Sequence, residues 1–158
     1  MKTNVRLALV ALMVGAAMLI TACGNNTTAG GGGGSTATTI DIGSNGENLA
    51  FDKTTLTVKA AAPVVVKFKN NSSAQQHNWV LVKGGDAVAA KIAADGLAAG
   101  AAGDFLPADK ANIIASTKLL NGGELGEISF TAPAAGTYEF ICTVPGHYPL
   151  MKGNLTVN

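Results

Sequence analysis

Three side chains that bind soft metal ions lie close together near the end of this sequence. The segment CTVPGHYPLMKG, residues 142–153, contains a thiol at Cys142, an imidazole at His147 and a thioether at Met151. The whole chain has only two cysteines and two histidines among its 158 residues, so this short segment holds a large share of the metal-binding side chains. The pattern predicts a metal site.

The second histidine, His77, completes a set of side chains that suits copper. Imidazole nitrogen satisfies Cu(II), whereas thiolate and thioether sulfur satisfy Cu(I). A trigonal site of two nitrogens and one sulfur, with a weak axial sulfur, fits both oxidation states moderately well. Copper would gain or lose one electron in such a site with little rearrangement, which is what electron transfer requires.

Turn-forming residues allow one loop to bring three of these side chains together. Pro145 and Gly146 permit a tight turn between the thiol and the imidazole, and Pro149 stiffens the return towards the thioether. His77 comes from the start of another strand. The sequence therefore predicts a compact site that is anchored to two sheets.

Alternating apolar residues predict a domain built mainly from strands. In PVVVKFKN, the side chains of Val64, Val66 and Phe68 share one face. The other predicted strands lie in TTIDIG, TLTVKA, HNWVLV, GELGEISFTAP, GTYEFIC and GNLTVN. Short strands at this spacing indicate an antiparallel sandwich or barrel.

One alanine-rich segment, residues 85–100, breaks the strand pattern. Val88, Ile92 and Leu97 form an apolar stripe at helical spacing, and Asp86 is a suitable N-cap. We expect a helix packed against the outside of the sandwich, with a structural role.

Residues 40–158 resemble the azurin branch of the cupredoxins, the blue copper proteins. The segments that carry this resemblance are HNWVLV, STKLLNGGELGEISFTAP and GTYEFICTVPGHYPLMKGNLTVN. Together with the N-terminal features described below, they are most similar to those of the auracyanins, azurin-like carriers of filamentous anoxygenic phototrophs. The resemblance implies an all-β, Greek-key sandwich or barrel of about eight strands with one external helix.

The resemblance also implies a role for each candidate ligand of one type 1 copper ion that cycles between Cu(I) and Cu(II). His77 and His147 would bind through a ring nitrogen, Cys142 as a thiolate and Met151 as the long axial ligand. The backbone carbonyl of Gln76 occupies the position of the family's opposite axial oxygen. Azurins usually have glycine there.

Residues around the ligands receive roles by the same resemblance. Asn78 and Thr143 match the pair that ties the two ligand segments together, and the amides of Asn78 and Val144 would point at the Cys142 sulfur. In the family, an apolar docking patch surrounds the solvent-facing histidine. The candidates for that patch are Val144, Tyr148, Pro149 and Leu150. The azurin N-terminal disulfide has no counterpart in this sequence.

Other functions would use the same side chains differently. A catalytic pair of Cys142 and His147 has no evident oxyanion donors or orienting acid. Copper oxidases and nitrite reductases need further histidines, and methionine is a poor ligand for zinc. An extracytoplasmic copper chaperone or storage protein is the main alternative to an electron carrier, and it would favour exposed methionine or cysteine clusters.

The first 22 residues have the features of a bacterial lipoprotein signal peptide. The apolar run at 7–20 is shorter than the roughly 20 residues needed to span a bilayer. ITAC, residues 20–23, resembles a lipobox whose cysteine, Cys23, is acylated and becomes the mature N-terminus. An ordinary signal peptide with an incidental cysteine is the alternative. We expect an exported protein, lipid-anchored to the extracytoplasmic face of a bacterial membrane.

The remaining chain divides into a short tether and one domain. Residues 23–38 contain five consecutive glycines and no large apolar side chain, which predicts a flexible tether, and residues 39–158 form the cupredoxin domain. After cleavage, the chain would contain nine lysines and ten acidic residues, so its net charge is close to zero. It has no block of basic residues that would indicate nucleic-acid binding. The resemblance implies a monomer that carries electrons from a quinol-oxidising complex to a reaction centre or cytochrome c, in a photosynthetic or respiratory chain.

Overall fold

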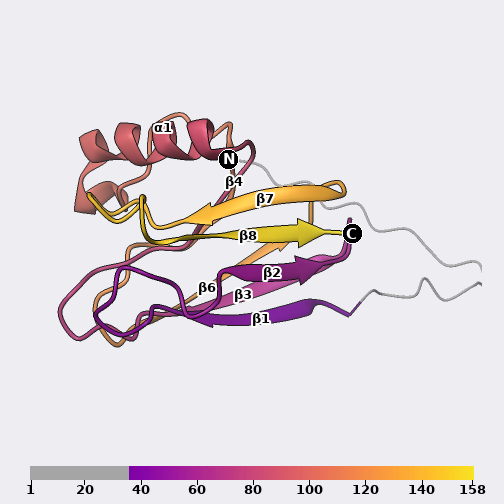
Figure 1. The fold of residues 1–158 in the computed structure, drawn as a ribbon, viewed down its shortest axis with the longest axis horizontal. Coiled ribbons are helices and arrows are strands. Elements are labelled where there is room, and N and C mark those ends of the chain that lie inside the picture. Colours follow the sequence, from indigo (N-terminus) through magenta and orange to yellow (C-terminus); the bar gives the residue numbers. More distant parts are fainter. Residues whose placement is uncertain (1–35) are drawn as a thin grey trace, which may run out of the picture. The chain divides into compact units, whose positions relative to one another are not determined.

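The computed structural model describes residues 36–158. Within this range, eight strands form two sheets, and one α-helix lies beside them (Figure 1). The strands are β1 (Thr38–Gly43), β2 (Thr55–Val58), β3 (Pro63–Lys69), β4 (Val80–Val82), β5 (Ile113–Ser116), β6 (Leu125–Thr131), β7 (Gly136–Ile141) and β8 (Lys152–Val157). The helix is α1 (Asp86–Gly96), followed by two short 3₁₀ turns, η1 (Leu97–Ala99) and η2 (Ala101–Gly103). The all-β class with one helix is confirmed.

The strands divide between the sheets in the order β1-β3-β6 and β2-β8-β7-β4-β5. Two neighbouring pairs are parallel, β1 with β3 and β2 with β8, and the remaining pairs are antiparallel. The sequence predicted an antiparallel sandwich or barrel, and these two parallel pairs are the departure from that prediction. After β1, the chain crosses to the other sheet to form β2 and then returns to the first sheet as β3. Strand β3 therefore runs in the same direction as its neighbour β1.

The main hydrophobic core lies between the two sheets. Alternation along β3 places Val64, Val66 and Phe68 inside, with at most 1% of each side chain exposed. Trp79 and Phe140 stack in the same core, with ring centroids 5.8 Å apart. Trp79 is fully buried, as expected for a core residue.

Helix α1 packs beside the five-stranded sheet through a second, smaller core. This core is formed by Val80, Val82, Ala89, Ile92, Leu106 and Ile141. The helix begins one residue earlier than predicted, because Gly85 is the N-cap and Asp86, the predicted cap, is the first helical residue. Leu97 is 55% exposed and begins a 3₁₀ turn, so it is not part of the buried stripe.

The strand β5 had no counterpart among the predicted strands. It pairs with β4 at the edge of the larger sheet, and only Ala115 of its four residues is buried. A short strand with this exposure lacks a clear alternating pattern. None of the helices in the described part of the chain is long and apolar enough to span a bilayer.

Candidate metal centre

The candidate ligands meet at one end of the five-stranded sheet, beside its inner strands β7 and β4. His77 lies just before β4 and Cys142 directly follows β7. These strands are antiparallel neighbours with Val80 opposite Ile141, so the start of one lies beside the end of the other. The two ligand segments therefore belong to one sheet, which corrects the prediction of a site anchored to two sheets. The other sheet is connected less directly, because His77 pairs with Leu120, ahead of β6.

The loop between β7 and β8 is folded by its own backbone hydrogen bonds. The Cys142 amide donates to the Met151 carbonyl at 3.0 Å, and the Met151 amide donates to the His147 carbonyl at 2.8 Å. The His147 amide donates to Val144 at 3.0 Å. Gly146 has a φ of 82°, which favours glycine in this turn. The loop thus brings Cys142, His147 and Met151 together without a partner segment.

Two ring nitrogens and one sulfur form a triangle of the right size for a metal ion. The Nδ1 atoms of His77 and His147 are 3.2 Å apart, and they lie 3.8 and 3.6 Å from the Cys142 Sγ. A point equidistant from the three atoms lies about 2.1 Å from each, close to the usual lengths of metal–nitrogen bonds, about 2.0–2.1 Å, and metal–sulfur bonds, about 2.3 Å. Within residues 36–158, these three side chains are the group with metal-binding geometry. The donor set and its dimensions fit copper.

Most of this site is shielded from solvent. The side chains of His77, Cys142 and Met151 are fully buried, whereas His147 is half-buried. Burial raises the pKa of the Cys142 thiol to about 11, although amide hydrogen bonds from Asn78 and Val144 oppose the shift. Burial and the neighbouring His147 lower the pKa of His77 to about 4, and burial also lowers the pKa of His147. At neutral pH the metal-free site is therefore uncharged.

Copper binding at pH 7 is expected to release about one proton per ion. The Cys142 thiol must lose its proton to become a ligand, and its pKa of about 11 keeps it protonated in the metal-free chain. Both imidazoles are already neutral at pH 7, because their pKa values are lowered. The apparent affinity should therefore rise about tenfold per pH unit between pH 7 and pH 10. Titration in a weakly buffered solution measures the protons, and two per copper would show that an imidazole is protonated too.

A buried amide joins the two segments that carry the ligands. Asn78 Nδ2 donates to Thr143 Oγ1 at 2.7 Å, and the Thr143 amide donates back to Asn78 Oδ1 at 2.8 Å. Asn78 Nδ2 also donates to the Asp104 carbonyl at 2.8 Å. The backbone amides of Asn78 and Val144 hydrogen-bond to the Cys142 sulfur. The structure thus places Asn78, Thr143 and Val144 together around Cys142.

The other predicted site residues differ in their surroundings. Gln76 is exposed, and its side chain donates to Asn121 Oδ1 at 2.8 Å. A contact between its carbonyl and copper stays a prediction. Pro149 and Leu150 are exposed, and 67% of Leu150 is accessible. Val144 packs against the main core and Tyr148 against the smaller one, so these two are only half-exposed.

Asn70 supports His77 in a way that the sequence did not reveal. Its side chain is fully buried and donates to the carbonyls of Gln75 and Leu120 at 2.8 and 3.0 Å. Its Oδ1 accepts from Ser44 and from the Ser72 amide. Asn70 thereby links Gln75, just before His77, to Leu120, which forms a β-bridge with His77. The turn-forming residues around Asn70 predict a loop, but nothing in that pattern shows that this asparagine is buried.

Comparisons with known proteins agree with this chemistry. Residues 37–158 match the model of the copper binding proteins, plastocyanin/azurin family. The chain is 60% identical to Auracyanin-A of Chloroflexus aurantiacus over an alignment of 162 residues that covers all of both chains.

Solved structures show the same relationship. The structure described as that of auracyanin A, a "blue" copper protein from C. aurantiacus, has a TM-score of 0.76 and 66% identity, and covers 77% of this chain and 99% of its own. The dithionite-reduced auracyanin of Roseiflexus castenholzii has a TM-score of 0.74 and 56% identity, and covers 77% and 97%. The converging donors, the fold and these similarities lead to one conclusion: the chain belongs to the plastocyanin/azurin family of copper-binding proteins.

Proposed function

We propose that the chain is a blue copper protein that carries single electrons between redox proteins. The observation that carries this proposal is the triangle of two imidazole nitrogens and one sulfur, with Met151 buried beside it. Bound copper would supply a centre that accepts and returns one electron. Backbone hydrogen bonds within the loop and the Asn78–Thr143 pair hold the donors in place, so the change of oxidation state requires little movement of the protein.

The protein acts as a carrier rather than as an enzyme. His77 and Cys142 are fully buried, so a substrate has no access to these two ligands. Electron exchange needs no such access, because electrons pass between centres that do not touch. The burial therefore supports exchange of electrons over catalysis at the metal.

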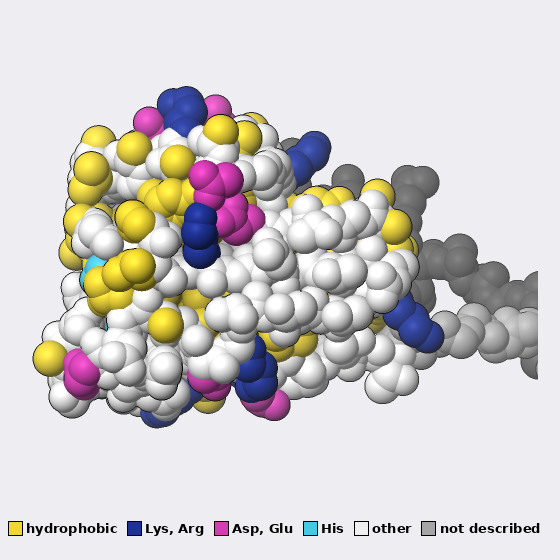
Figure 2. All heavy atoms as spheres, in the orientation of Figure 1, with side chains coloured by type: hydrophobic (Ala, Val, Ile, Leu, Met, Phe, Trp, Pro, Cys, Tyr) yellow, Lys and Arg dark blue, Asp and Glu magenta, His cyan; other side chains and the backbone are white. Residues whose placement is uncertain are grey.

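The half-buried His147 marks the surface where a redox partner approaches most closely. Figure 2 shows histidine atoms reaching the surface among hydrophobic side chains at the left end of the view. The proposed docking patch consists of Val144, Tyr148, Pro149 and Leu150. An apolar surface of this kind suits brief contacts with several partners.

A spectrum of the chain with one equivalent of Cu(II) tests this function. An intense thiolate-to-copper band in the visible range, with a narrow hyperfine splitting in electron spin resonance, is the expected result. A pale Cu(II) spectrum and rapid loss of copper to a mild chelator would contradict the proposal. They would favour a copper chaperone or storage protein instead.

Replacement of Met151 by leucine should leave copper bound and raise its reduction potential. Leucine makes the surroundings of the metal less polar, and an apolar site disfavours the oxidised ion, which carries one more positive charge. We expect a rise on the order of 60 mV, a tenfold shift in a one-electron equilibrium. Voltammetry of both proteins measures it, and complete loss of copper would show that Met151 is more than a weak axial ligand.

We also propose that the chain is exported and anchored to a membrane through lipid on Cys23. The predicted signal peptide, residues 1–22, and most of the predicted tether, residues 23–38, lie outside the described residues. The support is their sequence: a short basic start, an apolar run, and a cysteine where that run ends. Several acyl chains on one residue would hold the protein firmly at the extracytoplasmic face.

The anchor would keep a monomeric domain near its redox partners. Confinement to the membrane raises the local concentration of the domain beside membrane complexes. We propose a quinol-oxidising complex as the electron donor and a reaction centre or cytochrome c as the acceptor. Either a photosynthetic or a respiratory chain contains such a pair.

Replacement of Cys23 by serine should move the protein from the membrane to the soluble fraction. Serine cannot form the thioether through which a lipobox cysteine is acylated. Fractionation of the producing cells with an antibody against the domain measures the change, and a Cys142→Ser variant is the control because it leaves the proposed anchor intact. If the Cys23→Ser variant stays with the membranes, the lipoprotein assignment is wrong.

A further inference from the structure

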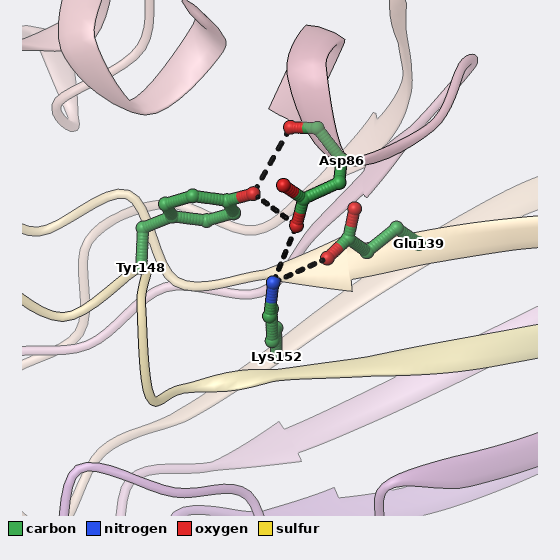
Figure 3. A network of polar contacts seen from close by, with 4 residues as sticks. All are labelled: Asp86, Glu139, Tyr148 and Lys152. Atoms are coloured by element: carbon green, nitrogen blue, oxygen red, sulfur yellow. Dashed lines mark hydrogen bonds and ion pairs between the residues drawn. The ribbon is translucent and has the colours of Figure 1, made fainter. Parts of the chain in front are cut away.

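One polar cluster joins the ligand loop to the first turn of α1 (Figure 3). The Tyr148 hydroxyl lies 2.7 Å from Asp86 Oδ1 and 3.0 Å from the Asp86 carbonyl oxygen, so it donates to this one residue. Lys152 Nζ lies 2.5 Å from the same Oδ1 and 3.5 Å from the Glu139 carboxylate. Asp86 is the first residue of α1, and the cluster therefore connects that helix to the loop and to β8.

The position of this cluster in the sequence links it to the copper site. Tyr148 directly follows His147, and Lys152 directly follows Met151. Within residues 36–158, the Tyr148 hydroxyl makes the only side-chain hydrogen bonds that connect residues 144–150 to a segment outside the metal site. This part of the loop thus depends on Tyr148 for its polar attachment to the rest of the domain.

Packing between the loop and the helix is incomplete. An open surface pocket of about 240 Å³ lies between them, with Ala90 and Ala94 on the helix side and Val144 and Tyr148 on the loop side. The Tyr148 ring packs against the smaller core, and its hydroxyl adds a directional contact to the helix beside this open pocket. Lys152 Nζ also lies 4.9 Å from the centre of the Tyr148 ring, a cation–π distance that holds the ring in its orientation.

We propose that Tyr148 and Asp86 are positioning residues for the copper ligands. The Tyr148–Asp86 contact fixes the backbone that follows His147, and so restrains the one ligand that is not fully buried. The His147 carbonyl accepts hydrogen bonds from the amides of Leu150 and Met151 at 3.0 and 2.8 Å. Release of Tyr148 would therefore loosen the turn that connects His147 to Met151.

Hydrogen exchange in the copper-free full chain tests the contact directly. Tyr148→Phe removes the hydroxyl but keeps the ring beside Lys152. We expect the Leu150 and Met151 amides to exchange about tenfold faster, with little change in the melting temperature. The control is Asp95→Ala, which breaks the exposed Lys91–Asp95 ion pair, 2.6 Å long, on the same helix. Equal exchange in both variants would overturn the proposal.

Substitutions at Asp86 give a graded second test. Asp86→Asn keeps an oxygen that can accept from Tyr148, whereas Asp86→Ala leaves only the backbone carbonyl as acceptor. Exchange should therefore increase least in Asp86→Asn, more in Asp86→Ala and most in Tyr148→Phe. A purely electrostatic role through Lys152 would make the two Asp86 variants alike, and that result would contradict positioning by the hydroxyl.

The copper-loaded protein shows whether the contact positions the ligands. Tyr148→Phe should release copper to a chelator about tenfold faster and broaden the electron spin resonance lines, because His147 samples more orientations. Faster amide exchange with unchanged copper release and unchanged lines would refute the positioning role. This inference rests on the proposed blue copper site. If the parent chain gives no blue spectrum, that function fails, whereas the exchange experiment still decides the role of Tyr148 in the loop.

Discussion

Replacement of Cys142 by serine is expected to abolish the intense visible absorption of the copper-loaded chain. The absorption arises from charge transfer between a thiolate and Cu(II), and Cys142 is the free cysteine of the described domain. Serine is nearly isosteric, but its hydroxyl is a far poorer ligand for copper than a thiolate. The Sγ lies 3.8 and 3.6 Å from the two imidazole nitrogens. The substitution therefore removes the sulfur corner of the donor triangle.

Absorption spectra at one equivalent of Cu(II) measure this effect. The matched control is Cys23→Ser, which removes the other cysteine of the chain and should keep the full band. Circular dichroism of the metal-free proteins checks that the sheets are intact. An intense band that survives in Cys142→Ser would show that the thiolate ligand has been assigned wrongly.

Replacement of Asn78 by alanine should destabilise the domain and disturb the copper site together. The side chain is fully buried and takes part in three hydrogen bonds with Thr143 and Asp104. Its loss leaves the Thr143 amide and hydroxyl and the Asp104 carbonyl without this partner. We expect the free energy of unfolding to fall by about 2–4 kcal/mol. We also expect copper to be released faster, because the two ligand segments lose their direct side-chain connection.

Urea unfolding of the copper-free proteins measures the change in stability. Gln76→Ala is the control, since it alters a nearby exposed side chain with a single hydrogen bond, to Asn121. Its effect should stay within about 0.5 kcal/mol. If the two variants unfold at the same urea concentration, the Asn78–Thr143 pair does not hold the ligand segments together.

Sequence reasoning succeeded where chemistry and local pattern determine the outcome. Three of the candidate ligands lie in one loop, so their types and spacing were enough to predict that they meet. The alternation in β3 correctly placed Val64, Val66 and Phe68 on one face of the strand, and this face is buried. His77 lies 65 residues from Cys142, and it was included because its imidazole completes the donor set for copper, not because of any spacing.

Features that depend on the pairing of distant segments could not be predicted in this way. A strand's periodicity shows which side is buried, but not which strand lies beside it, so the parallel pairs were missed. The same limit explains Tyr148, which the sequence suggests only as a docking residue. Its hydroxyl hydrogen-bonds to Asp86, which is 62 residues away in the chain, because α1 packs beside β7. Asn70 is similar, since its buried contact with Leu120 spans 50 residues.

The pairing of β4 with β7 also determines when copper can be captured during folding. The first histidine ligand and the cysteine are far apart in the chain, and they meet only after these two strands have paired. Contacts between distant segments form slowly because a long loop must close first. Copper would therefore be inserted into an assembled sheet instead of nucleating it, unlike the metal of a zinc finger, without which the chain is unfolded. The metal-free domain should accordingly be folded before it binds copper.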